Sequence, residues 1–533
     1  MTRRMAGEGW ILPALVATTI FGALLRVRLV GIGVWRDEAY TYFDVTQATL
    51  RGTFEHIVRV ETNPPLFFLL ERAVGSLFGF GELALKSLPL VCGIALVPAV
   101  YALGRTVMGR FGALLAAWLV AVSEPAIYYS QELRPYSLAA LLIALTARSY
   151  VRWVQLRERR PWWLVPGALL AFAHYIGPIV IAGLALGTAF LQPARRPRLL
   201  ALAAALSVLA LIFAPWVPGM LAQLQAGTPW VSFLPYAARF NSGIAITQYT
   251  LPFFTRDPGA GFLFAYLGIL ILGFGALALH SRLRREGAST TSDVGTFVML
   301  VAVLWSLCVE AMLGYRDPRY VFPLLPLATV PYVRLLSDAV ERLCARLGAA
   351  PAVAPLALAY LVLVASTTNV WPTVYLSSVD HPKTGMRAAG EELSSGSYAS
   401  AAVLVAPDYA APSCAFYLPG RPVHGFPRWD DPQYFDIVAD TAAWNAPFAV
   451  ARTLAEVEKL AAKGSKELAV VRPTALDEGF TQAGRLPYQL SNDLLEGLRK
   501  RYPVVARFDY PANVEWASAV VFDLSHPFRT THP

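Results

Sequence analysis

Two adjacent acids, Asp37 and Glu38, are the residues of this chain best suited to chemistry. They follow the first long apolar segment, residues 10–33, so they lie where a membrane-spanning helix would end. Charged groups at a membrane edge cost free energy unless they are paired or have a function. One interpretation is that the pair only caps a helix, because acids are favourable at a helix N-terminus. The other is that Asp37 accepts a proton from an attacking hydroxyl, because a partly desolvated carboxylate near basic groups suits general-base catalysis.

Glu132 and Arg134 lie in a short polar turn between two later apolar segments. They could form a local salt bridge with each other. Alternatively, Glu132 is a second acid that orients a substrate and Arg134 is a cation for a phosphate, since guanidinium groups make bidentate contacts with phosphate. The double proline Pro64-Pro65 precedes an apolar run and predicts the rigid start of a helix, because proline fixes φ and has no N–H.

Two more arginines, Arg316 and Arg319, lie in the turn 314–320. The order of the apolar segments places this turn on the outer face of the membrane, where positive charge is disfavoured. An anionic substrate would explain these cations, and pairing with a neighbouring acid or with lipid headgroups is the alternative. The pair His174-Tyr175 is open to two interpretations, a satisfied loop pair and a substrate contact.

Composition assigns the chain to the polytopic helical membrane proteins. Of its 533 residues, 56% are hydrophobic and 15% are charged, with a mean hydropathy of +0.47. Soluble domains usually carry about 25% charged residues. The net charge of +9 comes from short arginine clusters between apolar runs, which indicate topology and not nucleic-acid binding. The four cysteines are scattered and predict neither a disulfide framework nor a metal site.

The positive-inside rule orders about eleven predicted spans. They cover about residues 10–33, 83–104, 111–129, 135–154, 162–174, 176–191, 199–217, 261–280, 294–313, 321–337 and 351–371. The arginine-rich loops all fall on one side, so the polar turns and the C-terminal region lie on the outer side. Residues 34–82 form a long outer loop, in which 40–60 has apolar residues at helical spacing and is predicted to lie along the interface. Arg26 and Arg28, near the outer end of the first span, are open to two interpretations, snorkelling to the interface and contact with an anionic substrate.

From about residue 378 the composition becomes that of a soluble domain. Short buried strands are predicted at 401–406, 447–451, 467–471 and 517–522, and helices at 454–463 and 493–501. Alternating strands and helices indicate an α/β layer structure. The predicted domains are therefore 1–377, a transmembrane domain, and 378–533, an extracytoplasmic α/β domain.

At these motifs the chain resembles the GT-C superfamily of integral membrane glycosyltransferases, in particular its protein-mannosyltransferase and aminoarabinose-transferase-like branch. The matching segments are residues 35–40, 63–66, 129–137, 174–175 and 319–326. Their order and their side of the membrane also match those of the superfamily. The resemblance extends over residues 1–370, and the C-terminal region is covered only loosely.

The resemblance implies a GT-C fold and transfer of a sugar from a polyprenyl-phosphate donor to a hydroxyl of a lipid, glycan or protein acceptor, with inversion. The reaction would take place at the outer face of the inner or plasma membrane. Asp37 would be the catalytic base, with Glu38 beside it. The implied substrate-binding residues are Asn63, Glu132, Arg134, Tyr136, His174, Tyr175, Arg316, Arg319 and Tyr320. No cofactor is required, and a divalent metal ion is left open.

One position departs from the family pattern. Some relatives carry a lysine before the double proline, where it meets the lipid phosphate, and this chain has Asn63 there. The phosphate is therefore expected to bind arginines, namely Arg316 and Arg319 with help from Arg134. An aminoarabinose or lipid A specificity is left open by this departure.

Two other classes of protein compete with the enzyme. A transporter or flippase of lipid-linked substrates would place functional polar residues at mid-membrane, in broken helices and repeated halves. Here the polar residues cluster at the outer ends of spans, and no repeated halves are found. A receptor that uses the outer domain would leave Asp37, Glu38 and the outer arginines unexplained. The sequence therefore predicts a membrane glycosyltransferase.

Overall fold

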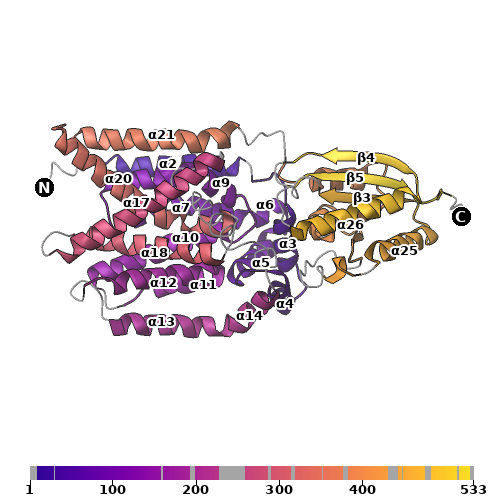
Figure 1. The fold of residues 1–533 in the computed structure, drawn as a ribbon, viewed down its shortest axis with the longest axis horizontal. Helices are drawn as coiled ribbons and strands as arrows, with labels where there is room; N and C mark the ends of the chain where they lie inside the picture. The colour runs from indigo at the N-terminus through magenta and orange to yellow at the C-terminus, as the bar shows by residue number, and fades with distance from the viewer. Residues whose placement is uncertain are drawn as a thin grey trace.

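The computed structural model describes residues 9–28, 30–157, 160–192, 199–226, 258–285, 290–313, 318–350, 352–375, 382–429, 442–446, 448–473, 482–512 and 515–528. A helical part and a C-terminal part with a β-sheet lie end to end (Figure 1). The predicted domain boundary at 377/378 lies outside the described residues.

A helix lies at each of the eleven segments predicted to span the membrane. These helices are α2 (Ile11–Val27), α7 (Ser87–Gly104), the pair α8 (Arg110–Val122) and α9 (Glu124–Ser130), α10 (Tyr136–Leu156), α11 (Leu164–Ala173), α12 (Ile176–Ala189), α13 (Leu199–Phe213), α17 (Pro258–Arg284), α18 (Thr291–Leu313), α20 (Leu325–Arg346) and α21 (Val353–Tyr375). Six helices in the described part of the chain are long and apolar enough to cross a bilayer, or seven if the bent pair α8 and α9 is one span. The number of spans stays a prediction.

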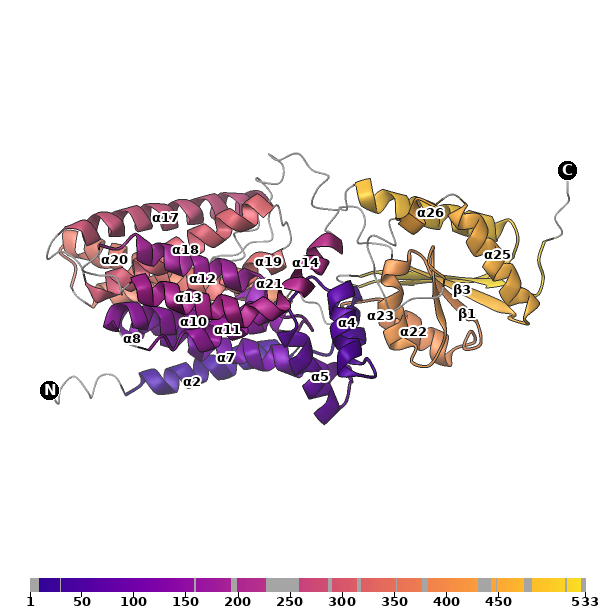
Figure 2. The same ribbon diagram turned by 90° about the horizontal axis from the view of Figure 1, so that it is seen from below.

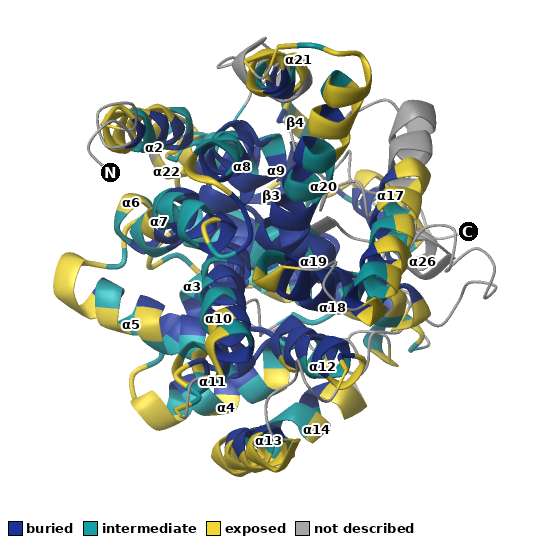
Figure 3. Ribbon diagram, turned by 90° about the vertical axis from the view of Figure 1, so that its left-hand side faces the viewer, coloured by how far each residue is buried: buried dark blue, intermediate teal, exposed yellow. Residues whose placement is uncertain are grey.

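The outer helices α13, α17 and α21 carry many exposed residues (Figure 3). Large apolar side chains are among them, since Leu200 on α13 is 85% exposed, Phe274 on α17 is 67% exposed and Leu356 on α21 is 69% exposed. The centre of the bundle, formed by α10, α18 and α20, is by contrast largely buried in one continuous apolar core. An apolar exterior of this kind is unfavourable in water and suits contact with lipid. The helical part is therefore that of a membrane protein.

Short helices fill the long outer loop between the bundle and the sheet (Figure 1). They are α3 (Arg36–Val45), α4 (Leu50–Val60), α5 (Leu66–Phe78) and α6 (Glu82–Leu85). Helix α4 begins after Thr49, whose side chain accepts the N–H of Gly52 as an N-cap. Helix α5 begins directly after Pro64-Pro65, as predicted from the fixed φ of proline.

The bend between α8 and α9 positions the polar turn that follows α9. The two helices differ in direction by 58°. Pro125 in α9 has no N–H, so it cannot bond the carbonyl of Ala121 four residues earlier. Arg26 replaces that donor, because its Nη1 donates to the Ala121 carbonyl at 2.8 Å and its Nη2 to the Val120 carbonyl at 3.0 Å. Arg26 is fully buried, so the snorkelling interpretation is wrong for this residue.

The C-terminal part has five described strands in one sheet. The strands are β1 (Ala402–Val405), β2 (Val423–Gly425), β3 (Glu467–Pro473), β4 (Val504–Tyr510) and β5 (Ala517–Asp523), in the order β2-β1-β3-β5-β4. Strands β2, β1 and β3 are parallel, and β5 is antiparallel to both of its neighbours. Helices α22 (Met386–Ser395) and α23 (Ala411–Tyr417) pack on one face of the sheet, and α25 (Ala449–Ala462) and α26 (Gln482–Arg499) on the other (Figure 2). The predicted α/β layer structure is confirmed.

Successive residues of the central strands alternate between the two apolar cores. Val403 and Val405 point to α22 and α23, and Leu404 between them points to α25 and α26. The strand predicted at 447–451 is wrong, because α25 begins at Ala449. A short apolar run does not distinguish a buried strand from a buried helix. Strands β2 and β4 were not predicted, since β2 has three residues and β4 is only partly buried.

Candidate active site

Asp37 lies in the first turn of α3 with both carboxylate oxygens paired to arginines. Its Oδ2 forms an ion pair with Nη1 of Arg319, and its Oδ1 accepts from Nε of Arg36 at 3.2 Å. Burial alone would raise the pKa of Asp37, but the charges of Arg319, Arg36 and Arg134 outweigh burial and hold the pKa well below its ordinary value. Asp37 is therefore an ionised carboxylate that is covered by cations in this structure.

Glu38 caps α3 and fastens it to the polar turn. Its Oε2 accepts the backbone N–H of Trp35 at 3.1 Å, which is the contact of an N3 acid with the N-cap residue. Its Oε1 accepts the N–H of Leu133 at 2.8 Å. Burial alone would raise the pKa of Glu38, but Lys383, Lys86 and these two N–H groups lower it below its ordinary value. The capping interpretation thus describes the contacts of Glu38.

Glu132 lies beside Glu38, and a lysine from the C-terminal part lies between them. Nζ of Lys383 is 3.1 Å from Oε2 of Glu38 and 3.5 Å from Oε1 of Glu132. The indole N–H of Trp35 also donates to Oε1 of Glu132 at 3.0 Å. Glu132 and Arg134 do not form the local salt bridge considered for this turn, because each pairs with a distant residue.

Arg134 pairs with Glu61, at the C-terminal end of α4. The pair is bidentate, with Nη1–Oε1 at 2.5 Å and Nη2–Oε2 at 2.9 Å. Nη1 also donates to the carbonyl of Asp37 and to the hydroxyl of Thr41, each at 3.1 Å. These contacts join the polar turn, α3 and α4. In this structure Arg134 is bound to other groups of the protein. The contact of Arg134 with phosphate stays a prediction.

Arg319 lies on the short helix α19 (Pro318–Val321), which precedes α20. Its guanidinium group lies 5.6 Å from the ring centroid of the neighbouring Tyr320. The side chain of Arg319 is 19% exposed, so it remains accessible from outside the protein. Arg316, the other arginine predicted to bind phosphate, lies outside the described residues.

Tyr136 and His174 both lie close to Arg134. Their ring centroids are 5.9 Å apart, and both side chains are buried. Nδ1 of His174 accepts the N–H of Ile176 at 3.1 Å. Burial and the charge of Arg134 lower the pKa of His174 to about 3, so the imidazole is neutral at physiological pH.

Asn63 and Tyr175 form a separate contact with helix α14 (Val217–Ala226). The Tyr175 hydroxyl donates to Oε1 of Gln223 at 2.5 Å, and Nε2 of Gln223 donates to the backbone carbonyl of Asn63 at 3.1 Å. The structure thus brings together Asp37, Glu38, Glu132, Arg134, Arg319 and Tyr320, with Tyr136 and His174 adjacent. Asn63 and Tyr175 are tied to α14 beside this group.

Four charged residues of the site were not among the predicted site residues: Arg36, which lies in the matching segment 35–40, Lys86, Glu61 and Lys383. Nζ of Lys86 donates to the carbonyl of Gly33 at 2.6 Å and lies 3.5 Å from Oε1 of Glu38. An acid or lysine at the end of an apolar segment is a signal that could have found Lys86 and Glu61. Lys383 is isolated in the sequence, and no local pattern marks it.

Helix α3 also forms the contact with the C-terminal part. The hydroxyl of Tyr40 donates to the carbonyl of Tyr409 at 2.8 Å, and the N–H of Val34 donates to the hydroxyl of Tyr417 at 2.5 Å. The guanidinium of Arg36 lies 5.2 Å from the ring centroid of Tyr409. The two parts therefore meet at the helix that carries Asp37.

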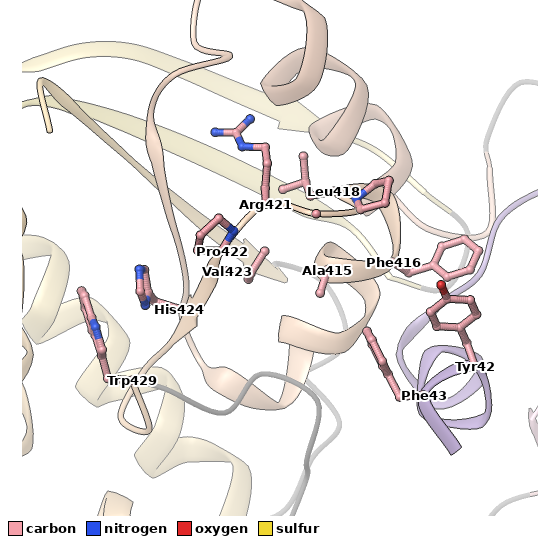
Figure 4. A pocket seen from close by; sticks show the side chains of 12 residues that line it. Tyr42, Phe43, Ala415, Phe416, Leu418, Arg421, Pro422, Val423, His424 and Trp429 are labelled. Carbon is pink, nitrogen blue, oxygen red and sulfur yellow. The ribbon is translucent and has the colours of Figure 1, made fainter. Parts of the chain in front are cut away.

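A cavity of about 420 Å³ lies between α3 and the C-terminal part (Figure 4). Tyr42 and Phe43 line it from α3, and Phe416, His424 and Trp429 are among the residues that line it from the other side. The rings of His424 and Trp429 are stacked, with centroids 4.4 Å apart. At 100° per residue, Tyr42 and Phe43 point away from the side of α3 that carries Asp37. The cavity therefore adjoins the site without containing Asp37.

Metal ligands are not grouped in the part of the chain that the structure describes. No three His, Cys, Asp or Glu side chains of these residues are arranged to hold a metal ion. The acids of the site are instead close to Arg36, Arg319, Lys86 and Lys383. A metal requirement stays open.

Part of the chain matches a known family in sequence. Residues 62–221 match the family of dolichyl-phosphate-mannose-protein mannosyltransferases. A sequence search of curated proteins gives no match.

Solved structures are similar over nearly the whole chain. ArnT from Cupriavidus metallidurans bound to undecaprenyl phosphate has a TM-score of 0.52 and 14% identity, over 96% of this chain and 98% of that one. Archaeal oligosaccharyltransferase AglB from Archaeoglobus fulgidus, in complex with an inhibitory peptide and a dolichol-phosphate, has a TM-score of 0.51 and 13% identity, over 93% of this chain and 73% of that one. The chain therefore has the same fold as these structures, and the match of residues 62–221 agrees with the resemblance that the motifs indicated.

Proposed function

We propose that this protein transfers a sugar from a polyprenyl-phosphate donor to an acceptor hydroxyl at the outer face of the inner or plasma membrane. The observation that carries the proposal is the contact between Asp37 and Arg319. A carboxylate that can take a proton and a guanidinium that can bind phosphate lie side by side, at the end of an apolar bundle. ArnT bound to undecaprenyl phosphate and AglB bound to dolichol-phosphate support a lipid-linked donor.

The reaction needs a base for the acceptor hydroxyl and cations for the leaving phosphate. The acceptor oxygen attacks the anomeric carbon, and its proton passes to Asp37. The bond between that carbon and the phosphate oxygen breaks, and polyprenyl phosphate leaves with the electron pair. Arg319 stabilises the charge of the leaving phosphate, and such electrostatic stabilisation commonly contributes more to catalysis than any other effect. A single displacement inverts the anomeric centre.

The ion pair between Asp37 and Arg319 gives the donor a second role. Both oxygens of Asp37 are paired with arginines, so neither is fully available to an acceptor hydroxyl. A donor phosphate that binds Arg319 would draw the guanidinium away from Oδ2 of Asp37. Loss of this neighbouring charge raises the basicity of the carboxylate. Donor binding would therefore prepare the base, and the acceptor would react second.

The C-terminal domain is proposed to lie outside the cytoplasm. The arginine-rich loops support this, because they imply an odd number of crossings after a cytoplasmic start. The domain contacts α3 through Tyr409 and the segment before α3 through Tyr417, and it borders the aromatic cavity, so it is placed to cover the site and help select the acceptor.

A flippase is disfavoured by the position of the polar residues. The paired acids and arginines lie at one end of the bundle, next to the C-terminal part, whereas a transporter needs its substrate site near mid-membrane. The match to mannosyltransferases over residues 62–221 also supports a transferase.

The test is direct assay of transfer. Purified protein is incubated with a panel of short-chain polyprenyl-phosphate sugars and with lipid extract or envelope glycans as acceptors, and the products are identified by mass spectrometry. Reactions with EDTA and with added Mg²⁺ or Mn²⁺ decide whether a metal is needed. Mass spectra of lipids and glycans from cells with and without the gene identify the sugar. No donor-dependent product in either setting would overturn the proposal.

A further inference from the structure

Lys383 belongs to the C-terminal part but lies inside the predicted active site. Its backbone N–H donates to the carbonyl of Ile32 at 2.8 Å, and its own carbonyl accepts the N–H of Glu515 at 3.1 Å. The residue is 2% exposed. It thus occupies a fixed position between the end of the first helix and the C-terminal domain.

The ammonium group of Lys383 is surrounded by two acids and two aromatic rings. It lies 3.1 Å from Oε2 of Glu38 and 3.5 Å from Oε1 of Glu132. It also lies 5.7 Å from the ring centroid of Trp35 and 5.2 Å from that of Tyr128. A buried charge costs free energy unless it is compensated, and these four groups compensate it.

Glu132 depends on this lysine more than Glu38 does. Glu38 has a second cation, Lys86, at 3.5 Å and accepts two backbone N–H groups. The pKa of Glu132 is raised above its ordinary value, because burial and the charges of Glu38 and Asp37 outweigh the opposite effect of Lys383 and Arg319. Its Oε2 is buried and has no hydrogen-bond partner among the described residues.

We infer that the C-terminal domain contributes Lys383 to the active site as a positioning residue, which holds Glu38 and Glu132 side by side next to Asp37 and favours their ionised forms. The inference rests on the proposed transferase function. An ionised Glu132 can accept a hydrogen bond from a sugar hydroxyl at its unpartnered Oε2. A protonated Glu132 would have an O–H group in place of the charged carboxylate, so this hydrogen bond from the sugar would be weakened or lost.

The expected effect of removing the lysine is a shift in pH dependence. Without Lys383, Glu132 is buried beside Glu38 and Asp37 with only Arg319 to offset them, so its pKa rises further. The acid limb, which is the pH below which kcat/KM falls, should therefore move to a pH about 1–3 units higher, the usual effect of one neighbouring charge. Activity should return as the pH is raised through the new limb.

The experiment compares pH profiles of Lys383→Met, Lys383→Arg and Arg387→Met. Arg387 is the matched control, because it joins the same domain to the bundle by an ion pair with Glu82. Lys383→Met should shift the acid limb, Lys383→Arg should restore most of it, and Arg387→Met should leave its position unchanged. An equal loss at all pH values for Lys383→Met would overturn the inference, because only a structural role predicts it.

Thermal unfolding gives a readout that does not depend on activity. Lys383→Met should lower the unfolding temperature more at pH 8 than at pH 5, since the uncompensated Glu132 is charged only at high pH. The added change Glu132→Gln should remove most of this difference. The same loss at both pH values, unaltered by Glu132→Gln, would overturn the inference. Absence of transfer by the wild-type protein would count against the proposed function and leave this test intact.

Discussion

Arg319 on α19 forms an ion pair with Asp37 on α3, 282 positions earlier in the chain, and Arg36 pairs with the other oxygen of the same carboxylate. The proposed base Asp37 is thus ionised, and both of its oxygens are occupied by arginines. The two arginine side chains are similarly exposed, 16% for Arg36 and 19% for Arg319. Arg36 is also held by the ring of Tyr409 in the C-terminal part, so Arg319 is proposed as the partner that a substrate phosphate draws away.

Asp37→Asn is expected to reduce transfer by about 10²–10⁴-fold, the usual contribution of a general base. Asn has the same size but cannot take a proton at neutral pH. The measurement is initial rate with saturating donor and acceptor, with the unfolding temperature of each variant as a check on folding. Transfer within a few-fold of wild type by folded Asp37→Asn would reject the assignment of the base.

Arg319→Ala is expected to lower kcat/KM for the donor by about ten- to a hundredfold. A charge-assisted contact with phosphate contributes about 1.5–3 kcal/mol, which corresponds to that range. Arg319→Lys should recover only part of the loss, because the planar guanidinium fork is gone. Steady-state kinetics in a short-chain polyprenyl-phosphate sugar measures the effect. If Arg319→Ala keeps the wild-type dependence on donor, the phosphate binds elsewhere.

Arg134→Ala is expected to act on stability more than on the donor. The side chain is buried and pairs with Glu61 through two hydrogen bonds, so its removal leaves an acid without its cation. Breaking one partner of such a buried pair costs about 3–5 kcal/mol. The unfolding temperature should fall more in Arg134→Ala than in Arg319→Ala. A folded Arg134→Ala with an impaired donor dependence would instead support the predicted contact with phosphate.

The sequence predicted those features that depend on neighbours along the chain. Long apolar runs mark the helices of the bundle, and the position of Asp37 just beyond the first run placed it at the start of α3. The fixed φ of Pro65 marked the start of α5. These features follow from local composition and backbone geometry.

The features that escaped prediction depend on partners far away in the chain. Lys383 is 251 positions from Glu132, and nothing local to Lys383 distinguishes it from a solvated lysine. A salt bridge within its own turn was one of the two interpretations of Arg134, but its partner is Glu61 on another helix. Strand β4 was missed because it is half exposed, so its apolar pattern is weak. Only the packing of the two parts brings these groups together.

The C-terminal domain is expected to be accessible from outside the cytoplasmic membrane. A cysteine placed at Lys463, which is exposed after α25, reports this when the more exposed native cysteines Cys308 and Cys344 are replaced. Lys463 is a better position than Gly464, whose φ of 98° strains any other residue. An impermeant thiol reagent should label Lys463→Cys in intact spheroplasts. Labelling only after lysis would reverse the topology.

Trp429→Ala is expected to raise the KM for acceptor by about two- to tenfold and to leave the KM for donor unchanged. The stacked rings of His424 and Trp429 line the cavity between α3 and the C-terminal domain, and one aromatic contact contributes about 0.5–1.5 kcal/mol. Trp516→Ala is the matched control, because Trp516 is 43% exposed in the same domain and does not line the cavity. If both variants behave alike, or if Trp429→Ala changes donor and acceptor equally, the cavity does not select the acceptor.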